Sequence, residues 1–280
     1  MHLLEKIRTP LSIFTISLSL LICNAGDIQA ELAKSSLGRV RFIQSPLISH
    51  ARKPPGRQRG ASSRGSCPTV NLKLPLTAIV PATLMGETKP GVDPSLTTWQ
   101  SVGGLTSTAN PDFVFYIPEE IAASPKEFVL QDSSGRNIYM TSFTQANSTR
   151  PGFTRIRIPL AFSLETNKIY RWFFLVNCDA DAPYEVDGWI QRVALNPALS
   201  RQLQFGSKLQ QTQVLAANGI WYDALSNLIE MRRANPQNQD LLSDWVELLD
   251  SVGLKDLALG PISPCCQPGA NANKSKPIPQ

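Results

Sequence analysis

The sequence predicts a β-rich α+β protein, in which an antiparallel, immunoglobulin-like β-sandwich is followed by a short C-terminal helical hairpin. Residues 169–178 place an apolar side chain at every second position, which is typical of a strand with one buried face. Other short apolar runs are separated by Pro- and Gly-containing turns, a pattern typical of a sandwich. After residue 196 the apolar spacing changes to that of an amphipathic helix.

The predicted strands follow one another along the chain. Aspartate, serine and glycine at residues 132–135 predict a tight turn between two of them. The strands are expected at residues 76–80, 113–117, 127–131, 137–143, 153–158, 169–178 and 186–193. Residues 85–104, with the pair Gly103-Gly104, predict a long polar loop. Trp172 and Trp189 are expected either in the core or as an exposed platform for sugar rings.

Apolar residues at helical spacing predict helices at residues 208–217, 221–233 and 241–252. The last two resemble a tetratricopeptide repeat, through Gly219, Tyr222, Ala224 and Pro236. This resemblance implies either a peptide-binding surface or plain packing against the sandwich. The candidate interaction residues are Trp221, Tyr222 and Trp245.

The N-terminus has the features of a secretory signal. Lys6 and Arg8 precede an apolar run at residues 11–22, and Ala25 and Ala30 are small residues suited to cleavage. The alternatives are an uncleaved anchor and a lipoprotein modified at Cys23. The predicted organisation is a signal peptide at 1–30, a basic disordered tether at 31–66, the sandwich at 67–195, the helical appendage at 196–260 and a disordered tail at 261–280. We expect export to the periplasm or the extracellular space.

Positive charge is concentrated in the tether. Residues 32–86 contain nine Lys or Arg and no Asp or Glu, whereas the chain from residue 87 contains 16 basic and 19 acidic residues. The tether is interpreted as a solvated linker, or as a basic arm for weak contact with anionic lipid headgroups or an acidic polymer. Nucleic acid is not an expected partner of an exported protein.

The sequence offers few groups for catalysis. Its two histidines, His2 and His50, both precede the predicted sandwich. This excludes histidine-based triads and histidine-ligated zinc from the sandwich and helices. We therefore expect no catalytic residues and no cofactor. A pair of facing carboxylates, with Glu119 and Glu120 as candidates, is the alternative.

Four acidic residues surround the turn before the last predicted strand. They could offer oxygen ligands to Ca²⁺, although a solvated acidic turn is the simpler interpretation and no metal site is predicted. These residues are Asp179, Asp181, Glu185 and Asp187.

Cysteine usage predicts one disulfide bond. Cys67 opens the predicted sandwich and Cys178 ends its central strand, so an oxidising compartment would favour their pairing. Two free buried thiols are the alternative. Cys265 and Cys266 lie in the tail, where they could pair with a partner chain or have no role.

Seven motifs together resemble a family of cyanobacterial exported proteins, domain of unknown function 928. They are LTAIVP (76–81), FVFYIP (113–118), FVLQD (128–132), YRWFF (170–174), GWIQRV (188–193), GIWYDAL (219–225) and WVELLDSVGL (245–254). The resemblance implies a β-rich domain with a short helical end and supplies no activity.

The leading functional hypothesis is an exported, non-enzymatic module for protein–protein interaction or cell-envelope support, with an envelope protein or polymer as partner. A carbohydrate-binding module with exposed Trp and a carboxylate-based hydrolase are the alternatives.

Overall fold

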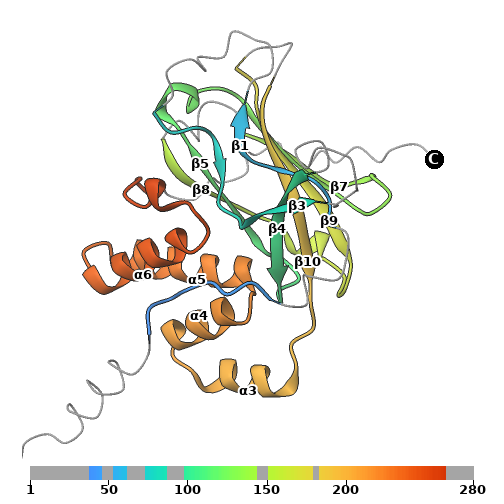
Figure 1. Ribbon diagram of the computed structural model, residues 1–280. Helices are drawn as coiled ribbons and strands as arrows, with labels where there is room; N and C mark the ends of the chain where they lie inside the picture. Colours follow the sequence, from blue (N-terminus) through green and yellow to red (C-terminus); the bar gives the residue numbers. More distant parts are fainter. Residues whose placement is uncertain are drawn as a thin grey trace, which may run out of the picture. The chain divides into compact units, whose positions relative to one another are not determined.

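The structure is a computed structural model that describes residues 38–45, 53–61, 73–86, 98–143, 151–178 and 183–262. The chain divides into units 1–38 and 39–280, and the fold below is that of the second. Its described strands are β1 (Arg57–Ala61), β2 (Thr77–Ala78), β3 (Ala82–Gly86), β4 (Thr98–Thr106), β5 (Asp112–Ile117), β6 (Lys126–Gln131), β7 (Asn137–Phe143), β8 (Gly152–Arg157), β9 (Ile169–Val176) and β10 (Tyr184–Arg192) (Figure 1). The α-helices are α3 (Pro197–Phe205), α4 (Lys208–Ala217), α5 (Trp221–Ala234) and α6 (Gln239–Asp250), and short 3₁₀ helices are η2 (Glu119–Ile121), η4 (Leu160–Phe162) and η5 (Lys255–Leu257).

The strands form one curled, mostly antiparallel sheet. Its hydrogen-bonded path is β7-β6-β9-β10-β1-β2-β5-β8, and β4 pairs in parallel with the end of β10 and antiparallel with β3. The curl brings β5 across from β6 and β9. Phe115 stacks on Phe174 with ring centroids 4.2 Å apart, and Phe113 lies 4.8 Å from Phe128. The β-rich prediction is confirmed, whereas the immunoglobulin-like arrangement of two separate sheets is not.

The predicted strands reappear as β2 and β5 to β10, with ends shifted by a few residues. In β9 buried and half-buried side chains alternate strictly, because the face of Trp172 and Phe174 meets the core. Every residue of β5 is buried, since helices cover the side of β5 that faces away from the core. The hydroxyl of Ser226 in α5, for example, donates to Asp112 at 2.5 Å.

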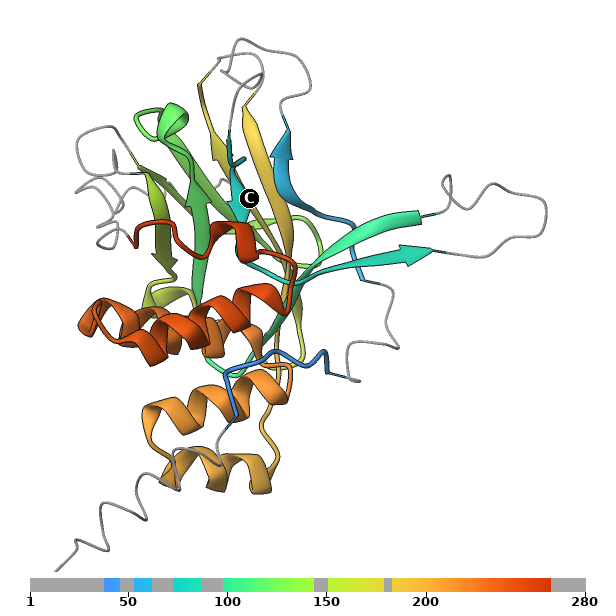
Figure 2. The ribbon, with the colours of Figure 1, turned by 60° about the vertical axis from the view of Figure 1, so that its left-hand side comes forward.

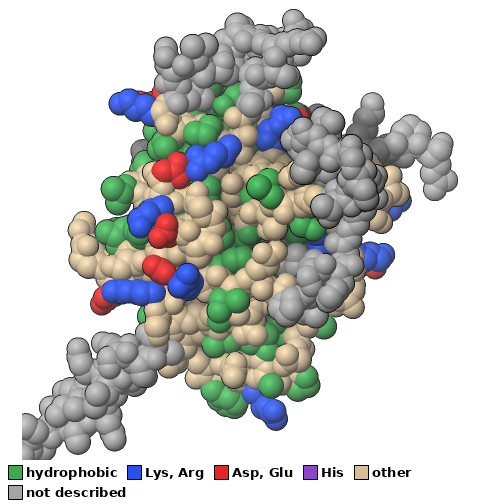
Figure 3. Space-filling model, viewed as in Figure 1, with side chains coloured by type: hydrophobic (Ala, Val, Ile, Leu, Met, Phe, Trp, Pro, Cys, Tyr) green, Lys and Arg blue, Asp and Glu red, His purple; other side chains and the backbone are tan. Residues whose placement is uncertain are grey.

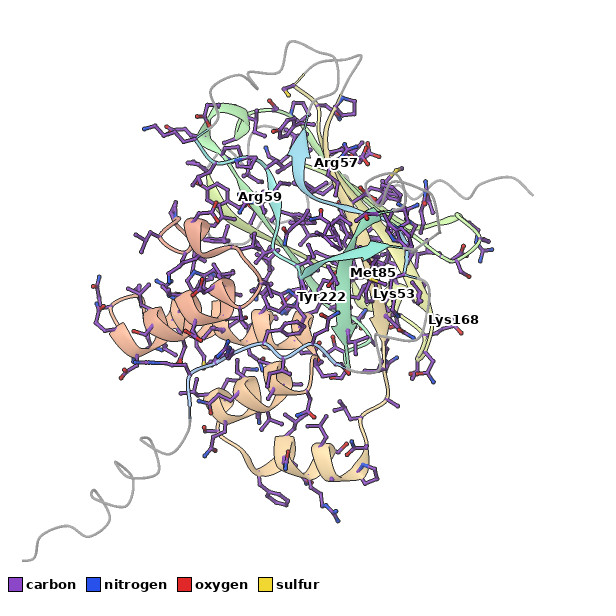
Figure 4. The ribbon with its side chains drawn as sticks, in the orientation of Figure 1. Lys53, Arg57, Arg59, Met85, Lys168 and Tyr222 are labelled. Carbon is purple, nitrogen blue, oxygen red and sulfur yellow. The ribbon has the colours of Figure 1, made fainter. Side chains whose placement is uncertain are left out.

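The prediction of a disordered tether is wrong for residues 38–45 and 53–61. Residues 57–61 form β1, which lies between β10 and β2 in the sheet. Lys53 is only 3% exposed, with its Nζ 4.7 Å from the centroid of the Trp189 ring. Arg59 donates two hydrogen bonds to Asp256, at 2.8 and 2.9 Å. Two basic residues of the predicted arm are therefore held by the folded body (Figure 4).

The predicted loop at residues 85–104 is also wrong at its C-terminal end, where β4 begins at Thr98. Gly103 and Gly104 lie inside this strand. A Cβ atom at Gly103 would lie 2.4 Å from the carbonyl oxygen of Trp189, and one at Gly104 would lie 3.1 Å from the Cβ of Trp221. Gly103 thus allows β4 and β10 to approach each other closely, and Gly104 allows the first turn of α5 to approach the sheet.

The helices predicted at 208–217, 221–233 and 241–252 correspond to α4, α5 and α6, while α3 was not predicted. The side chain of Asn196 caps α3 by accepting from the N–H of Leu199 at 2.8 Å, and Pro197 occupies its first position. Figure 2 shows the four helices together beside the curled sheet. The tetratricopeptide-like arrangement is not confirmed. Within the described ranges no helix combines the length and hydropathy needed to cross a bilayer.

Candidate functional site

Residues 39–45, named here the docked segment, run in extended conformation across the helices. Figures 1 and 2 show this segment in blue, passing between α4 and α6. Its side chains alternate: Val40 is fully buried and Phe42 is 9% exposed, whereas Arg39, Arg41 and Ile43 are exposed. One face of the segment therefore meets the helices and the other faces solvent.

Aromatic packing fixes the buried face of the segment. The ring of Phe42 meets the ring of Trp221 edge-on, with centroids 5.1 Å apart and an interplanar angle of 88°. Trp221 is fully buried and its indole Nε1 donates to the carbonyl oxygen of Ile79 at 2.8 Å. The surface beneath Phe42 is therefore held rigidly by the sheet.

Backbone N–H groups of the segment donate to acceptors on α4, on α6 and on Ser251, the residue that follows α6. The N–H of Val40 donates to Oδ1 of Asp244 at 3.2 Å, and that of Phe42 donates to Oγ of Ser251 at 3.3 Å. The N–H of Ile43 donates to the carbonyl oxygen of Ala216 at 3.1 Å. We call Ala216, Trp221, Asp244, Glu247 and Ser251 the docking surface.

Charge on the docking surface complements the segment. Arg39 lies 3.5 Å from the carboxylate of Asp240 and 3.8 Å from that of Asp244, and Arg41 lies 3.9 Å from that of Glu247. Figure 3 shows basic and acidic side chains side by side on this face. Of these five side chains all but Asp244 are at least 38% exposed, so the exposed pairs contribute at most about 1 kcal/mol each. Burial raises the pKa of Asp244, while the Val40 N–H and Arg39 lower it.

Gly219, which lies beside the docked segment, is required for two separate reasons. Gly219 precedes α5 with φ of 75°, in the left-handed region that favours glycine. A Cβ atom here would lie 2.5 Å from the Cβ of Ser45 and 2.7 Å from its backbone nitrogen. The turn that starts α5 therefore also makes room for the end of the docked segment.

The other two candidate interaction residues are buried in the body. Tyr222, labelled in Figure 4, accepts from the indole of Trp172 at 2.9 Å and donates to the carbonyl oxygen of Trp189 at 3.1 Å. Burial raises its pKa. Trp245 packs edge-on against Phe153 of β8, with centroids 4.9 Å apart. Both attach helices to the sheet, and only Trp221 reaches the docked segment.

The first turn of α5 is also tied to β4 by a buried carboxylate. Asp223 accepts from the hydroxyl of Thr106 at 2.5 Å, from the backbone N–H of Ser107 at 2.9 Å and from the Ser107 hydroxyl. Burial raises the pKa of Asp223, although these hydrogen bonds oppose the rise.

Comparison with known families gives one assignment. The model of the family described as Domain of Unknown Function (DUF928) matches residues 59–262. The chain belongs to this family. No curated protein matches it. In this DUF928 chain the helices that carry the docking surface lie inside the matched range, whereas the docked segment precedes it.

A cavity of about 460 Å³ lies between the β6–β7 turn and residues 161–170 of the DUF928 fold. Its charged side chains pair with each other. Arg136 lies 2.9 Å from Asp132, and Lys168 lies 2.8 Å from Glu165. The hydroxyl of Ser134 lowers the pKa of Asp132 to about 2. Among the described lining residues, each basic side chain is therefore paired with a carboxylate.

The remaining predicted site residues lie on other elements or outside the described residues. Glu185 and Asp187 lie in β10, and Arg171 binds Asp187 at 2.8 Å. Asp179 and Asp181 lie outside the described residues, and the described part of the chain holds no group of three potential metal ligands. Trp172 and Trp189 are buried, which removes them as a sugar platform.

The cysteine prediction falls partly outside the described residues. Cys178 follows β9 and is disulfide-bonded. Because Cys67 lies outside the described residues, its pairing with Cys178 stays a prediction.

The docked segment was missed because its charge suggested a tether. The signal that could have revealed it is the sequence Arg-Val-Arg-Phe at residues 39–42. Its alternation of basic and apolar side chains is typical of an extended segment with one buried face.

Proposed function

We propose that this DUF928 protein is an exported, non-enzymatic interaction module whose helices hold an extended polypeptide segment. The occupant of its docking surface is a segment with alternating basic and apolar residues. Binding of such a segment would serve protein–protein contact or support within the cell envelope. The proposal rests on one observation: residues 39–45 of the same chain occupy the docking surface.

The chemistry of the docking surface supports this role. Extended polypeptide segments are recognised through main-chain hydrogen bonds and pockets for alternate side chains. The docking surface supplies three backbone contacts, an apolar position for Phe42 beside Trp221, and carboxylates opposite Arg39 and Arg41.

The boundary of the family match is a second argument. The docking surface lies within residues 59–262, and the docked segment lies before them. The docking surface thus belongs to the part of the chain that matches the family, while the docked segment lies before that part. We infer that other chains carrying a similar segment can take its place.

Export is a further part of the proposal. It is supported by the signal-like features of residues 1–30, which lie outside the described residues. The carboxylates with described roles act in structure, since Asp112 binds Arg157 at 2.7 Å and Asp223 anchors α5. This supports a binding role over a carboxylate-based hydrolase.

The test uses the full chain with its own segment weakened. A fluorescent peptide of residues 38–46 is titrated against the wild-type chain, the Phe42→Ala variant and the Ile43→Ala variant, and binding is followed by anisotropy. Ile43 is 57% exposed and serves as the matched control. We expect the Phe42→Ala chain to bind the peptide at least tenfold more tightly than the other two chains. Its own docked segment leaves the docking surface more often, so the surface is more often free for the peptide.

A control peptide and one refuting outcome complete this test. A peptide carrying Phe42→Ala should bind every chain weakly. If the unaltered peptide binds the Phe42→Ala chain no better than it binds the wild-type chain, the surface is a permanent intramolecular contact and the interaction role fails.

A further inference from the structure

The C-terminal end of α5 borders a second cavity, with chemistry opposite to that of the docking surface. Its volume is about 430 Å³, within the range of small-ligand sites. We call it the arginine pocket. Its described lining residues are Arg232, Arg233, Pro236, Leu259, Pro261 and Ile262, with the backbone of Gly260.

Cationic groups in this pocket lack the partners found elsewhere in the fold. No Asp or Glu is among the described residues that line it. In the other cavity each basic side chain has a carboxylate within 3 Å. Basic residues in the last turn of α5 interact favourably with the negative end of the helix dipole. That effect explains why they occur there but gives them no hydrogen-bond acceptor.

Arg232 is the more informative of the two arginines. Its guanidinium lies over the ring of Trp245, 5.8 Å from the centroid. Its Nη1 is shielded from solvent and has no hydrogen-bond partner among the described residues. Burial also lowers its pKa. A shielded N–H donor without an acceptor is costly, and an oxyanion entering the adjacent pocket would supply that acceptor.

The other described lining residues of the pocket are apolar. Leu259 is 83% exposed, so most of its side chain is accessible to a ligand. With two prolines and Ile262 it forms an aliphatic border next to the two guanidinium groups. The ligand that fits both features is an anion joined to an aliphatic group.

We propose that the arginine pocket binds the carboxylate of a polypeptide terminus whose last side chain is aliphatic. A guanidinium presents paired N–H donors in the plane that matches a carboxylate. Arg232 and Arg233 hold the carboxylate, and Leu259 with Ile262 covers the terminal side chain. This site is separate from the docking surface, so it stands or falls independently of the proposed function.

Calorimetric titration of the full chain tests the pocket. The probe is acetyl-Gly-Gly-Leu with a free carboxylate, and the control ligand is the same peptide as its C-terminal amide. Inorganic phosphate is the third arm, which separates peptide recognition from general anion binding. We expect the acid to bind, and the amide and phosphate to bind at least tenfold more weakly.

Variants then locate the site. Arg232→Gln and Arg233→Gln should each weaken binding of the acid at least tenfold, and Arg232→Lys should also weaken it because an ammonium cannot pair in the same plane. Arg201→Gln is the matched control, since Arg201 is an exposed arginine on α3. If Arg232→Gln does not fold, the exposed Arg233 carries the test.

Four results would overturn the proposal. They are no binding of the acid, equal binding of acid and amide, equal binding of phosphate, and equal weakening by Arg201→Gln and the pocket variants. The first three refute a carboxylate-specific peptide site, and the last shows that binding follows net charge alone.

Discussion

Replacement of Phe42 by alanine should release the docked segment without unfolding the body. Val40 and Phe42 are buried, and three backbone hydrogen bonds hold the segment to the helices. Loss of the Phe42 ring removes about 2 to 3 kcal/mol, which shifts the docking equilibrium roughly 30- to 150-fold toward release.

Hydrogen exchange measures this equilibrium directly. The amide of Ile43 is protected by its bond to the carbonyl oxygen of Ala216 at 3.1 Å, and its exchange rate reports local opening. We expect this amide to exchange at least 30-fold faster in the Phe42→Ala variant, with the urea midpoint of the body unchanged. Ile43→Ala keeps the same backbone bond and should exchange like the wild-type chain. Equal exchange in both variants would show that the aromatic contact with Trp221 does not hold the segment.

Three further predictions concern the body of the protein. Gly219→Ala should lower the free energy of unfolding by about 1 to 2 kcal/mol for the left-handed backbone alone, and by more if Ser45 is displaced, as urea denaturation would show; an unchanged midpoint contradicts this. Burial raises the pKa of Asp223, so the folded state holds the proton of the Asp223 carboxyl more tightly than the unfolded state. The contribution of this proton to stability is greatest below the unfolded pKa of about 3.9, and it declines as pH rises through the folded pKa. Asp223→Asn should therefore lose less stability than the wild-type chain between pH 4 and pH 7 in thermal melts, and parallel pH profiles would refute the assignment. Mass spectrometry of the non-reduced protein should recover Cys67 and Cys178 in one linked peptide, whereas separate peptides would end that pairing.

Local patterns predicted the parts of the fold that local patterns control. The alternation in β9 and the helical stripe of α6 each identify an apolar face, and both elements formed as expected. A stripe does not say what it packs against. The sequence therefore makes Trp221, Tyr222 and Trp245 interaction candidates, although all three are buried in the folded chain.

Elements that depend on distant partners escaped prediction. Gly103 and Gly104 have the composition of a loop, yet β4 requires them because Trp189 and Trp221 lie against the strand. Arg59 has the composition of a linker, yet it binds Asp256, almost two hundred residues away in the sequence. In both cases the decisive contact lies far along the chain, where composition and periodicity carry no information.

The charge asymmetry of the chain has a structural meaning that follows from these contacts. The basic residues before residue 87 and the acidic excess after it meet in the folded body, as Arg39 does with Asp240 and Arg59 with Asp256. Because exposed ion pairs add little stability, their contribution to the docked segment is chiefly to set its direction and register, while Phe42 and Val40 supply the affinity. A partner segment that competes for the docking surface must therefore reproduce the apolar spacing first and the positive charge second. An acidic segment with the same apolar spacing should be rejected by the carboxylates of α6, so the docking surface selects its occupant by sign of charge as well as by shape.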